Sequence, residues 1–294
     1  MSSATAGLAT RLRTWLLVAG LTALLISVGA AIGGAFLYLF AGFAVVMNAV
    51  GYWCSDRIAL AASRAKPLAP DDYPELHRLV GELAGRAGVP MPRLYLTPSD
   101  QPNAFATGRN PDHSAIAVTE GLLHYLPVEQ VRGVLAHELA HIRNRDILVS
   151  SIAAMIAGAI SSIATVLQFS LLFGGGDEED SGPLGWIGTI AAIVVAPLAA
   201  TLLQLAVSRQ REYLADATAA RLLGEGAPLA DALETLERGT QALPMSVNPA
   251  LASLYIASPL PVRGLGALFA THPPIAERVR RLREIDGAAL AVVA

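Results

Sequence analysis

The stretch Ala136-His-Glu-Leu-Ala-His-Ile-Arg-Asn-Arg-Asp146 decides how the rest of the sequence is interpreted. His137 and His141 stand four positions apart in a segment with helical spacing, so their imidazoles project from one face, one turn apart. Two neutral imidazoles in this arrangement suit Zn²⁺, and Glu138, rotated by about 100° from His137, can reach a metal-bound water without ligating the metal. The stretch therefore predicts a helix that carries a zinc site.

The flanking residues predict where this helix begins and ends. Pro127 suits the first helical position, because the N–H that proline lacks would have no partner there. Glu129 and Gln130 fall in the first turn, whereas Arg143 and Arg145 lie near the end, where the helix dipole favours cations. These signals favour one helix across the whole motif.

The composition is that of a membrane protein with a polar domain attached. Of the 294 residues, 53% are hydrophobic and 15% are charged, and the mean hydropathy is +0.49, which is too apolar for an ordinary soluble enzyme. The net charge of −3 and the pI near 6.1 offer no basic surface for nucleic acid. Cys54 is the only cysteine, which excludes an internal disulfide.

Three long runs of the sequence contain no charged residue, and each is long enough to cross a bilayer. Residues 14–55, of which there are 42, would form a helix of about 63 Å, twice the hydrocarbon thickness of roughly 30 Å. This run therefore predicts two spans with a turn near Gly33-Gly34. A cleaved signal peptide is the alternative, but a second apolar stretch follows at once without a cleavage region. Residues 147–176 and 181–208 predict one further span each.

The charges around these runs predict the orientation in the membrane. The loop Asp177-Glu-Glu-Asp180 is acidic, whereas basic residues flank the other ends of the runs, and the positive-inside rule places the basic ends in the cytoplasm. We therefore expect four spans with both termini inside. The expected regions are an N-terminal transmembrane hairpin (1–56), the first part of a catalytic domain (57–146), a second transmembrane hairpin (147–208) and the second part of the catalytic domain (209–294).

The two polar regions are predicted to be mainly α-helical with a small β-sheet. Pro67 to Pro74 is expected to be a linker or turn. Alternating or β-prone residues bounded by Pro, Asn, Gly and Asp predict short strands at 93–96, 104–107 and 115–118. Apolar residues at helical spacing predict helices at 75–87, 210–223, 229–238 and 274–285.

A catalytic zinc takes three protein ligands and leaves one position for water, so a third donor must come from elsewhere in the chain. Glu212 and Asp216 stand four apart on one face of the helix predicted after the last span. Glu212 is the natural ligand, and Asp216 could accept the outer N–H of a metal-bound histidine. Two acids at this spacing repel each other, which favours a nearby cation over an ordinary surface pair.

Four motifs in this order resemble the HtpX family of membrane-bound zinc metalloproteases, which are related to the CAAX prenyl proteases. They are His137-Glu-Leu-Ala-His141, Glu212-Tyr-Leu-Ala-Asp216, Pro102-Asn-Ala-Phe-Ala-Thr-Gly108, and Thr271-His-Pro-Pro274 followed by Glu277-Arg-Val-Arg-Arg-Leu282. The resemblance covers nearly the whole chain. Ala217-Thr-Ala-Ala220 departs from it, since many relatives carry glycines there, which puts close helix packing in question but not the chemistry.

The resemblance implies a gluzincin-type catalytic domain on the cytoplasmic face of the inner (plasma) membrane, in a multi-pass protein. It implies an endopeptidase of membrane protein quality control, with unfolded or membrane proteins as substrates and the lipid bilayer as a further partner. By position, His137, His141 and Glu212 would bind one Zn²⁺ per chain, and Glu138 would be the general base. Glu138 would take a proton as the zinc-bound water attacks the peptide carbonyl, and would pass it to the leaving amine.

Other residues are weaker candidates for the site. His272 precedes Pro273-Pro274 and is a candidate to stabilise the developing oxyanion, with a helix-capping or surface position as the alternative. Arg278 is a candidate to neutralise a site carboxylate or bind substrate, or else a solvated surface residue. Asn103, Ala104 and Phe105 are expected in an exposed edge strand to which a substrate could add, although Phe105 is equally suited to a core position.

The sequence disfavours three other classes of protein. An intramembrane protease would place the charged helix around His137 in hydrocarbon, which its Glu and Arg residues disfavour. A membrane scaffold or chaperone with a structural zinc would be expected to close the site with a fourth protein ligand. A transporter would be expected to carry ionisable residues within its spans, and the three runs contain none.

Overall fold

The computed structural model describes residues 36–152, 209–243, 249–259 and 272–293, with a few single positions between them and near the N-terminus. The predicted turn at Gly33-Gly34, the acidic loop at 177–180 and nearly all of the second transmembrane hairpin lie outside these residues. Among the described residues, helix α2 (Phe36–Ala62) is long and apolar enough to cross a membrane, judged by length and composition. The four-span prediction therefore stays a prediction.

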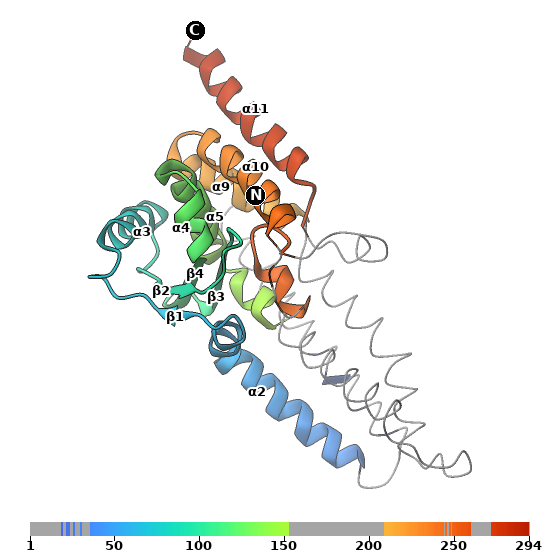
Figure 1. The fold of residues 1–294 in the computed structure, drawn as a ribbon. Helices are drawn as coiled ribbons and strands as arrows, with labels where there is room; N and C mark the ends of the chain where they lie inside the picture. The colour runs from blue at the N-terminus through green and yellow to red at the C-terminus, as the bar shows by residue number, and fades with distance from the viewer. Residues whose placement is uncertain are drawn as a thin grey trace, which may run out of the picture.

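A four-stranded sheet in the order β1-β2-β4-β3 forms one side of the polar domain (Figure 1). Strand β2 (Arg93–Thr97) pairs in parallel with β4 (His113–Thr119), and β3 (Ala104–Asn110) pairs with β4 antiparallel. These are the three predicted strands. Strand β1 (Lys66–Pro67) was not predicted, because Pro67 was expected to begin a linker or turn. Pro67 is tolerated there because β1 is an edge strand.

The remaining elements are helical, so the prediction of a mainly helical fold with a small sheet is confirmed. Helix α5 (Val128–Asn144) begins one residue later than expected and has Pro127 at its N-cap. Leu126 and Pro127 separate it from α4 (Glu120–Tyr125), so the chain is not continuously helical after the strands. The other helices are α3 (Pro74–Ala87), α9 (Arg209–Leu223), α10 (Ala227–Ala242), the 3-10 turn η2 (Pro249–Leu254) and α11 (Ile275–Val293).

Helix α5 is the central element of the core. Its residues Leu135, Leu139 and Ile142 are completely buried, and it packs against α9, α10, α3 and β3. Gly133 permits the closest of these contacts, since a Cβ atom there would lie 2.6 Å from the backbone N of Leu229 in α10. The metal-binding motif is therefore held on a helix that is packed on several sides.

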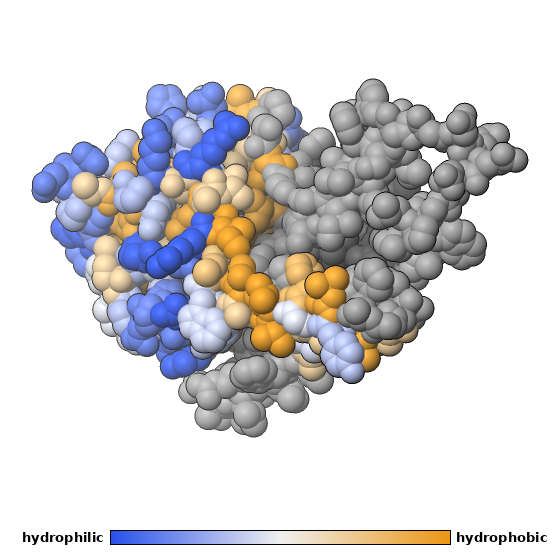
Figure 2. All heavy atoms as spheres, turned by 90° about the horizontal axis from the view of Figure 1, so that it is seen from below, coloured by the Kyte–Doolittle hydropathy of each residue, from blue (hydrophilic) through white to orange (hydrophobic). Residues whose placement is uncertain are grey.

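Helix α2 extends from the underside of the sheet, away from the rest of the domain (Figure 1). Its last turns are buried where Ala59 and Leu60 pack against Phe105 and Ala117, whereas its earlier part exposes large apolar side chains. Seen from below, hydrophobic side chains gather on this side of the described residues (Figure 2). The exposed apolar residues of α2 are Tyr38, Leu39, Phe43, Val45, Val46, Tyr52, Trp53 and Ile58.

Candidate metal centre

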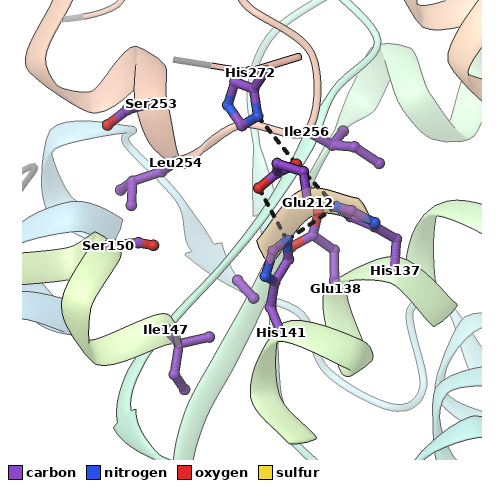
Figure 3. A pocket seen from close by; sticks show the side chains of 11 residues that line it. His137, Glu138, His141, Ile147, Ser150, Glu212, Ser253, Leu254, Ile256 and His272 are labelled. Carbon is purple, nitrogen blue, oxygen red and sulfur yellow. Dashed lines mark hydrogen bonds and ion pairs between the residues drawn. The ribbon is translucent and has the colours of Figure 1, made fainter. Parts of the chain in front are cut away.

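Helices α5 and α9 bring three metal-binding side chains to one point. His137 and His141 come from α5 and Glu212 comes from the first turn of α9, although more than seventy positions separate Glu212 from either histidine in the sequence. The Nε2 atoms of the two histidines are 3.0 Å apart, and they lie 3.7 Å (His137) and 3.6 Å (His141) from the Glu212 carboxylate oxygens. Figure 3 shows the three side chains converging.

Each histidine is oriented by an aspartate on its other ring nitrogen. His137 Nδ1 lies 3.0 Å from Asp216 Oδ1, and His141 Nδ1 lies 3.1 Å from both carboxylate oxygens of Asp146. A carboxylate accepts the Nδ1 proton and leaves the lone pair on Nε2, which selects the tautomer that binds a metal. Both imidazoles therefore direct Nε2, the atom that would bind a metal, toward Glu212.

The separations of these atoms fit a zinc ion. Two ligands at the Zn–N distance of 2.0–2.1 Å and a tetrahedral angle lie about 3.3 Å apart, close to the distances among the three donors. Glu212 Oε2 is buried and accepts no hydrogen bond of good geometry, although His272 Nδ1 lies 3.2 Å and Arg278 Nη1 3.7 Å away, so this oxygen can serve as a metal ligand. The residues present therefore fit a catalytic zinc with three protein ligands.

The two histidines have different proton affinities. Burial lowers the pKa of His137 to about 4, so this imidazole is neutral. Burial acts in the same direction on His141, but the charge and hydrogen bond of Asp146 outweigh it and raise the pKa of His141 to about 10. A metal ion must displace the proton of His141 to bind, so metal affinity should increase with pH.

Arg278 is the largest fully buried side chain among the described residues, and it neutralises Asp216. Its Nε and Nη2 atoms donate to the two carboxylate oxygens of Asp216 at 2.9 and 2.8 Å, and Nη1 donates to the Ile256 carbonyl at 3.1 Å. Burial would raise the pKa of Asp216, but the Arg278 charge and hydrogen bonds lower it to about 2. The arginine thus supports His137 through Asp216. Because Arg278 is completely buried, the prediction that it binds substrate was wrong.

Glu138 lies beside the three donors without joining them. It is buried, and burial together with the charge of Glu212 raises its pKa to about 7, against the opposing effects of His141 and a hydrogen bond from the backbone of Ala106. A carboxyl with a pKa near neutrality can both accept and donate a proton. Its position is therefore that of an acid–base group next to a metal.

The pocket around these residues is also lined by residues that were not predicted from the sequence. Besides Glu138 and the three donors, it is lined by His272, whose Nδ1 lies 3.2 Å from Glu212 Oε2. One wall comes from the residues after α5 and another from the segment after α10 (Figure 3). The lining residues of these walls and of the nearby strand are Ala106, Ile147, Ser150, Ser253, Leu254 and Ile256.

The predicted edge strand is present but covered at its first residues. Strand β3 is at the end of the sheet, yet Asn103 and Ala104 are buried, because the Ile256 N–H donates to the Ala104 carbonyl at 3.0 Å. The Asn103 amide donates to the Ala257 carbonyl at 2.8 Å. Phe105 packs edge-on against Tyr255 in the core beneath the sheet. The expectation of an exposed strand was therefore wrong at Asn103 and Ala104, and Phe105 takes the core position that was its alternative.

Comparison with known proteins identifies the family. Residues 70–286 match Peptidase family M48. The chain belongs to this family. A Protease HtpX homolog of Pelotomaculum thermopropionicum is 50% identical over 273 residues, which cover 92% of this chain and 97% of that protein. The corresponding homolog of Syntrophobacter fumaroxidans is 52% identical over 280 residues, with 94% and 99% coverage.

These relatives confirm the predicted HtpX resemblance and the class of enzyme, a metalloprotease that hydrolyses peptide bonds. Among solved structures, S. mikatae Ste24p aligns with a TM-score of 0.53 over 95% of this chain and 67% of that chain. At 20% identity this likeness concerns the fold. The His-His-Glu group found in the structure is the kind of site an M48 metalloprotease requires.

Asp146 is the site residue that the sequence analysis overlooked. It lies just past the charged end of α5, and its carboxylate faces His141. The chain can turn back in this way because Arg145 adopts a left-handed conformation, with φ of 61°, at the helix C-cap. An acid five positions after the second histidine was the available signal.

Proposed function

We propose that this metalloprotease is a zinc-dependent, membrane-bound endopeptidase that hydrolyses misfolded or damaged membrane proteins at the cytoplasmic face. The observation that carries the proposal is the convergence of His137, His141 and Glu212, with an aspartate fixing each imidazole and Glu138 alongside. This arrangement leaves room in the coordination sphere for a reactant, because three protein donors meet among the described residues.

In the proposed mechanism, Glu138 transfers protons. A zinc ion bound at the site would polarise the scissile carbonyl and lower the pKa of a coordinated water toward ~7. Glu138 would accept a proton during attack on the carbonyl and return it to the leaving amine, and a pKa near neutrality suits both steps. Asp146 and Asp216 would keep the imidazoles in the metal-binding tautomer, and Arg278 would keep Asp216 ionised.

We propose that His272 stabilises the developing oxyanion and that β3 binds the substrate backbone. His272 lines the pocket next to Glu212, within reach of charge that develops at the metal. Because the Ala104 carbonyl is already bonded to Ile256, strand addition would begin at Ala106, which lines the pocket. Recognition through backbone groups supports broad sequence specificity.

The proposed location rests on the charge pattern and on α2. Four spans with both termini in the cytoplasm would bring α5 and α9 to the same face, which their contact requires. A reporter enzyme inserted into the 177–180 loop tests this orientation. Reporter activity on the outer side of the membrane is expected, and cytoplasmic activity would reverse the assignment.

Cleavage of an unfolded protein tests the catalytic proposal. Purified protein in mild detergent with zinc should degrade casein, and Glu138→Ala should abolish cleavage while the bound zinc remains. Full activity in the Glu138→Ala protein would refute the mechanism. The alternative of a scaffold or chaperone with a structural zinc is not favoured, since the chain belongs to a peptidase family.

A further inference from the structure

The metal centre lies close to the ends of all three uncharged runs of the sequence. Ile147, the first residue of the 147–176 run, lines the pocket beside His141. Glu212 is three residues into α9, about 5 Å along the helix axis from Arg209, the residue that follows the 181–208 run. The 181–208 run therefore ends within about one helical turn of Glu212, and the 147–176 run begins at the pocket itself.

The third run ends beneath the strand that lines the pocket. Ser55 is the last residue of the 14–55 run, and Leu60 lies about 8 Å further along the same helix, packed against Phe105. The next residue of β3, Ala106, lines the pocket and bonds to Glu138. The end of this run is thus separated from the reacting groups by about 8 Å of helix and the thickness of one strand.

Direct contacts hold these connections in place. Helix α2 continues without a break from its exposed apolar part to its contact with the sheet. Its Asp56 pairs with Arg93 of β2 at 2.6 Å, and Thr107 of β3 forms a hydrogen bond of 2.8 Å with Ser151 in the 147–176 run. Strand β3 is therefore held from below by α2 and from the side by the residues that follow α5.

The exposed side chains of α2 indicate where the hydrocarbon ends. Aromatic side chains gather at membrane interfaces, and Tyr52 and Trp53 are exposed just before the first charges of α2, Asp56 and Arg57. The helix lengths from the run ends are about 5 Å (Arg209 to Glu212) and about 8 Å (Ser55 to Leu60). Adding part of the headgroup layer to these lengths gives about 10–20 Å between the hydrocarbon edge and the pocket. An extended peptide covers this distance with about three to six residues.

We propose that the preferred substrates are polypeptides cut next to their own membrane span, with the scissile bond about three to six residues from its end. The inference rests on the proposed function and names its substrate class. Its basis is the fixed, short separation between the pocket and the apolar runs. A membrane-anchored substrate is confined near the site, so its effective concentration depends on the length of the spacer between span and scissile bond.

The expected size of the effect follows from chain statistics. For a flexible spacer longer than the gap, effective concentration falls with roughly the −3/2 power of its length. Lengthening a Gly/Ser spacer from 5 to 40 residues should therefore reduce the cleavage rate about 20-fold at low substrate concentration. The same segment without a span should be cleaved more slowly still.

The test uses the full chain with zinc in phosphatidylcholine–phosphatidylglycerol vesicles. Each substrate has one Leu/Ala span, a Gly/Ser spacer of 5, 15 or 40 residues and the same casein-derived segment, and mass spectrometry locates the cut. The segment alone, and the Glu138→Gln enzyme, are the controls. A rate that falls steeply with spacer length, with cuts near the span at the shortest spacer, is the expected result.

Two other outcomes would overturn the inference in different ways. Equal rates for all spacers and for the free segment, with cleavage lost in Glu138→Gln, would reject the preference for sites near a span but leave the protease function intact. No Glu138-dependent cleavage of any substrate, the free segment included, would reject the proposed function and the inference with it.

Discussion

Replacing Arg278 by methionine should destabilise the protein strongly. Arg278 is not one of the three metal-binding side chains, but it is completely buried. The substitution keeps an apolar side chain of similar length but removes two charge-assisted hydrogen bonds of 2.8 and 2.9 Å to Asp216. Asp216 would then be a buried charge without its counter-ion. Breaking a buried pair in this way typically costs about 3–5 kcal/mol.

The pKa of Asp216 gives an independent magnitude. Its fall from 3.8 to about 2, caused by the Arg278 charge against the effect of burial, corresponds to roughly 2–3 kcal/mol of stability at neutral pH. Because the folded-state pKa is the lower one, this stability is present above about pH 4 and is lost as the pH falls through about 2. The stability difference between the wild type and the variant should therefore be largest above about pH 4 and should narrow as the pH falls through about 2.

Thermal unfolding in detergent, followed at pH 7 and at successively lower pH, measures both effects. Arg280→Met is the matched control on the same helix, since Arg280 is exposed and pairs with Glu277 and Glu284 of that helix. It should change stability little. The double variant Arg278→Met with Asp216→Asn should recover part of the loss, because the unpaired charge is gone. The account is refuted if Arg278→Met is as stable as Arg280→Met, or if the double variant recovers nothing.

Further expectations concern the support of the site and the packing of α5. Asp146→Asn should weaken zinc binding by about 10–100-fold, measured in competition with a chelator, because His141 loses its charged partner. The control Asp112→Asn, in the exposed β3–β4 turn, should leave zinc affinity unchanged. Equal zinc affinities of the two variants would show that Asp146 does not support the site. Gly133→Ala should lower the unfolding temperature, since its Cβ would clash with α10. The control Gly85→Ala, which has open space around it, should leave the unfolding temperature unchanged or raise it. A lower unfolding temperature for Gly85→Ala than for Gly133→Ala would contradict the packing described for α5.

Local periodicity was sufficient to predict much of the fold and the principal site residues. The spacing of His137 and His141 placed both imidazoles on one face, and the same argument found Glu212 with Asp216 on a second helix. The strands predicted at 93–96, 104–107 and 115–118 from β-prone runs between turn residues correspond to β2, β3 and β4. These predictions depend on neighbours in the sequence.

What the sequence could not show depends on contacts between distant residues. The cover over Ala104 comes from Ile256, and no local pattern predicts that this pair will bond. Arg278 sits within an exposed-looking run of charged residues in the sequence, yet the fold buries it against Asp216. Asp146 reaches His141 only because Arg145 turns the chain in a left-handed conformation, which a non-glycine residue adopts infrequently.

The central claim is that His137, His141 and Glu212 hold one zinc ion together. The direct measurement is zinc content per chain, by elemental mass spectrometry, for the wild type, Glu212→Gln and the control Glu225→Gln, whose glutamate is exposed near the end of α9. The wild type and Glu225→Gln should carry about one zinc per chain, and Glu212→Gln should carry far less and lose casein cleavage. A full equivalent of zinc retained by Glu212→Gln would contradict the claim.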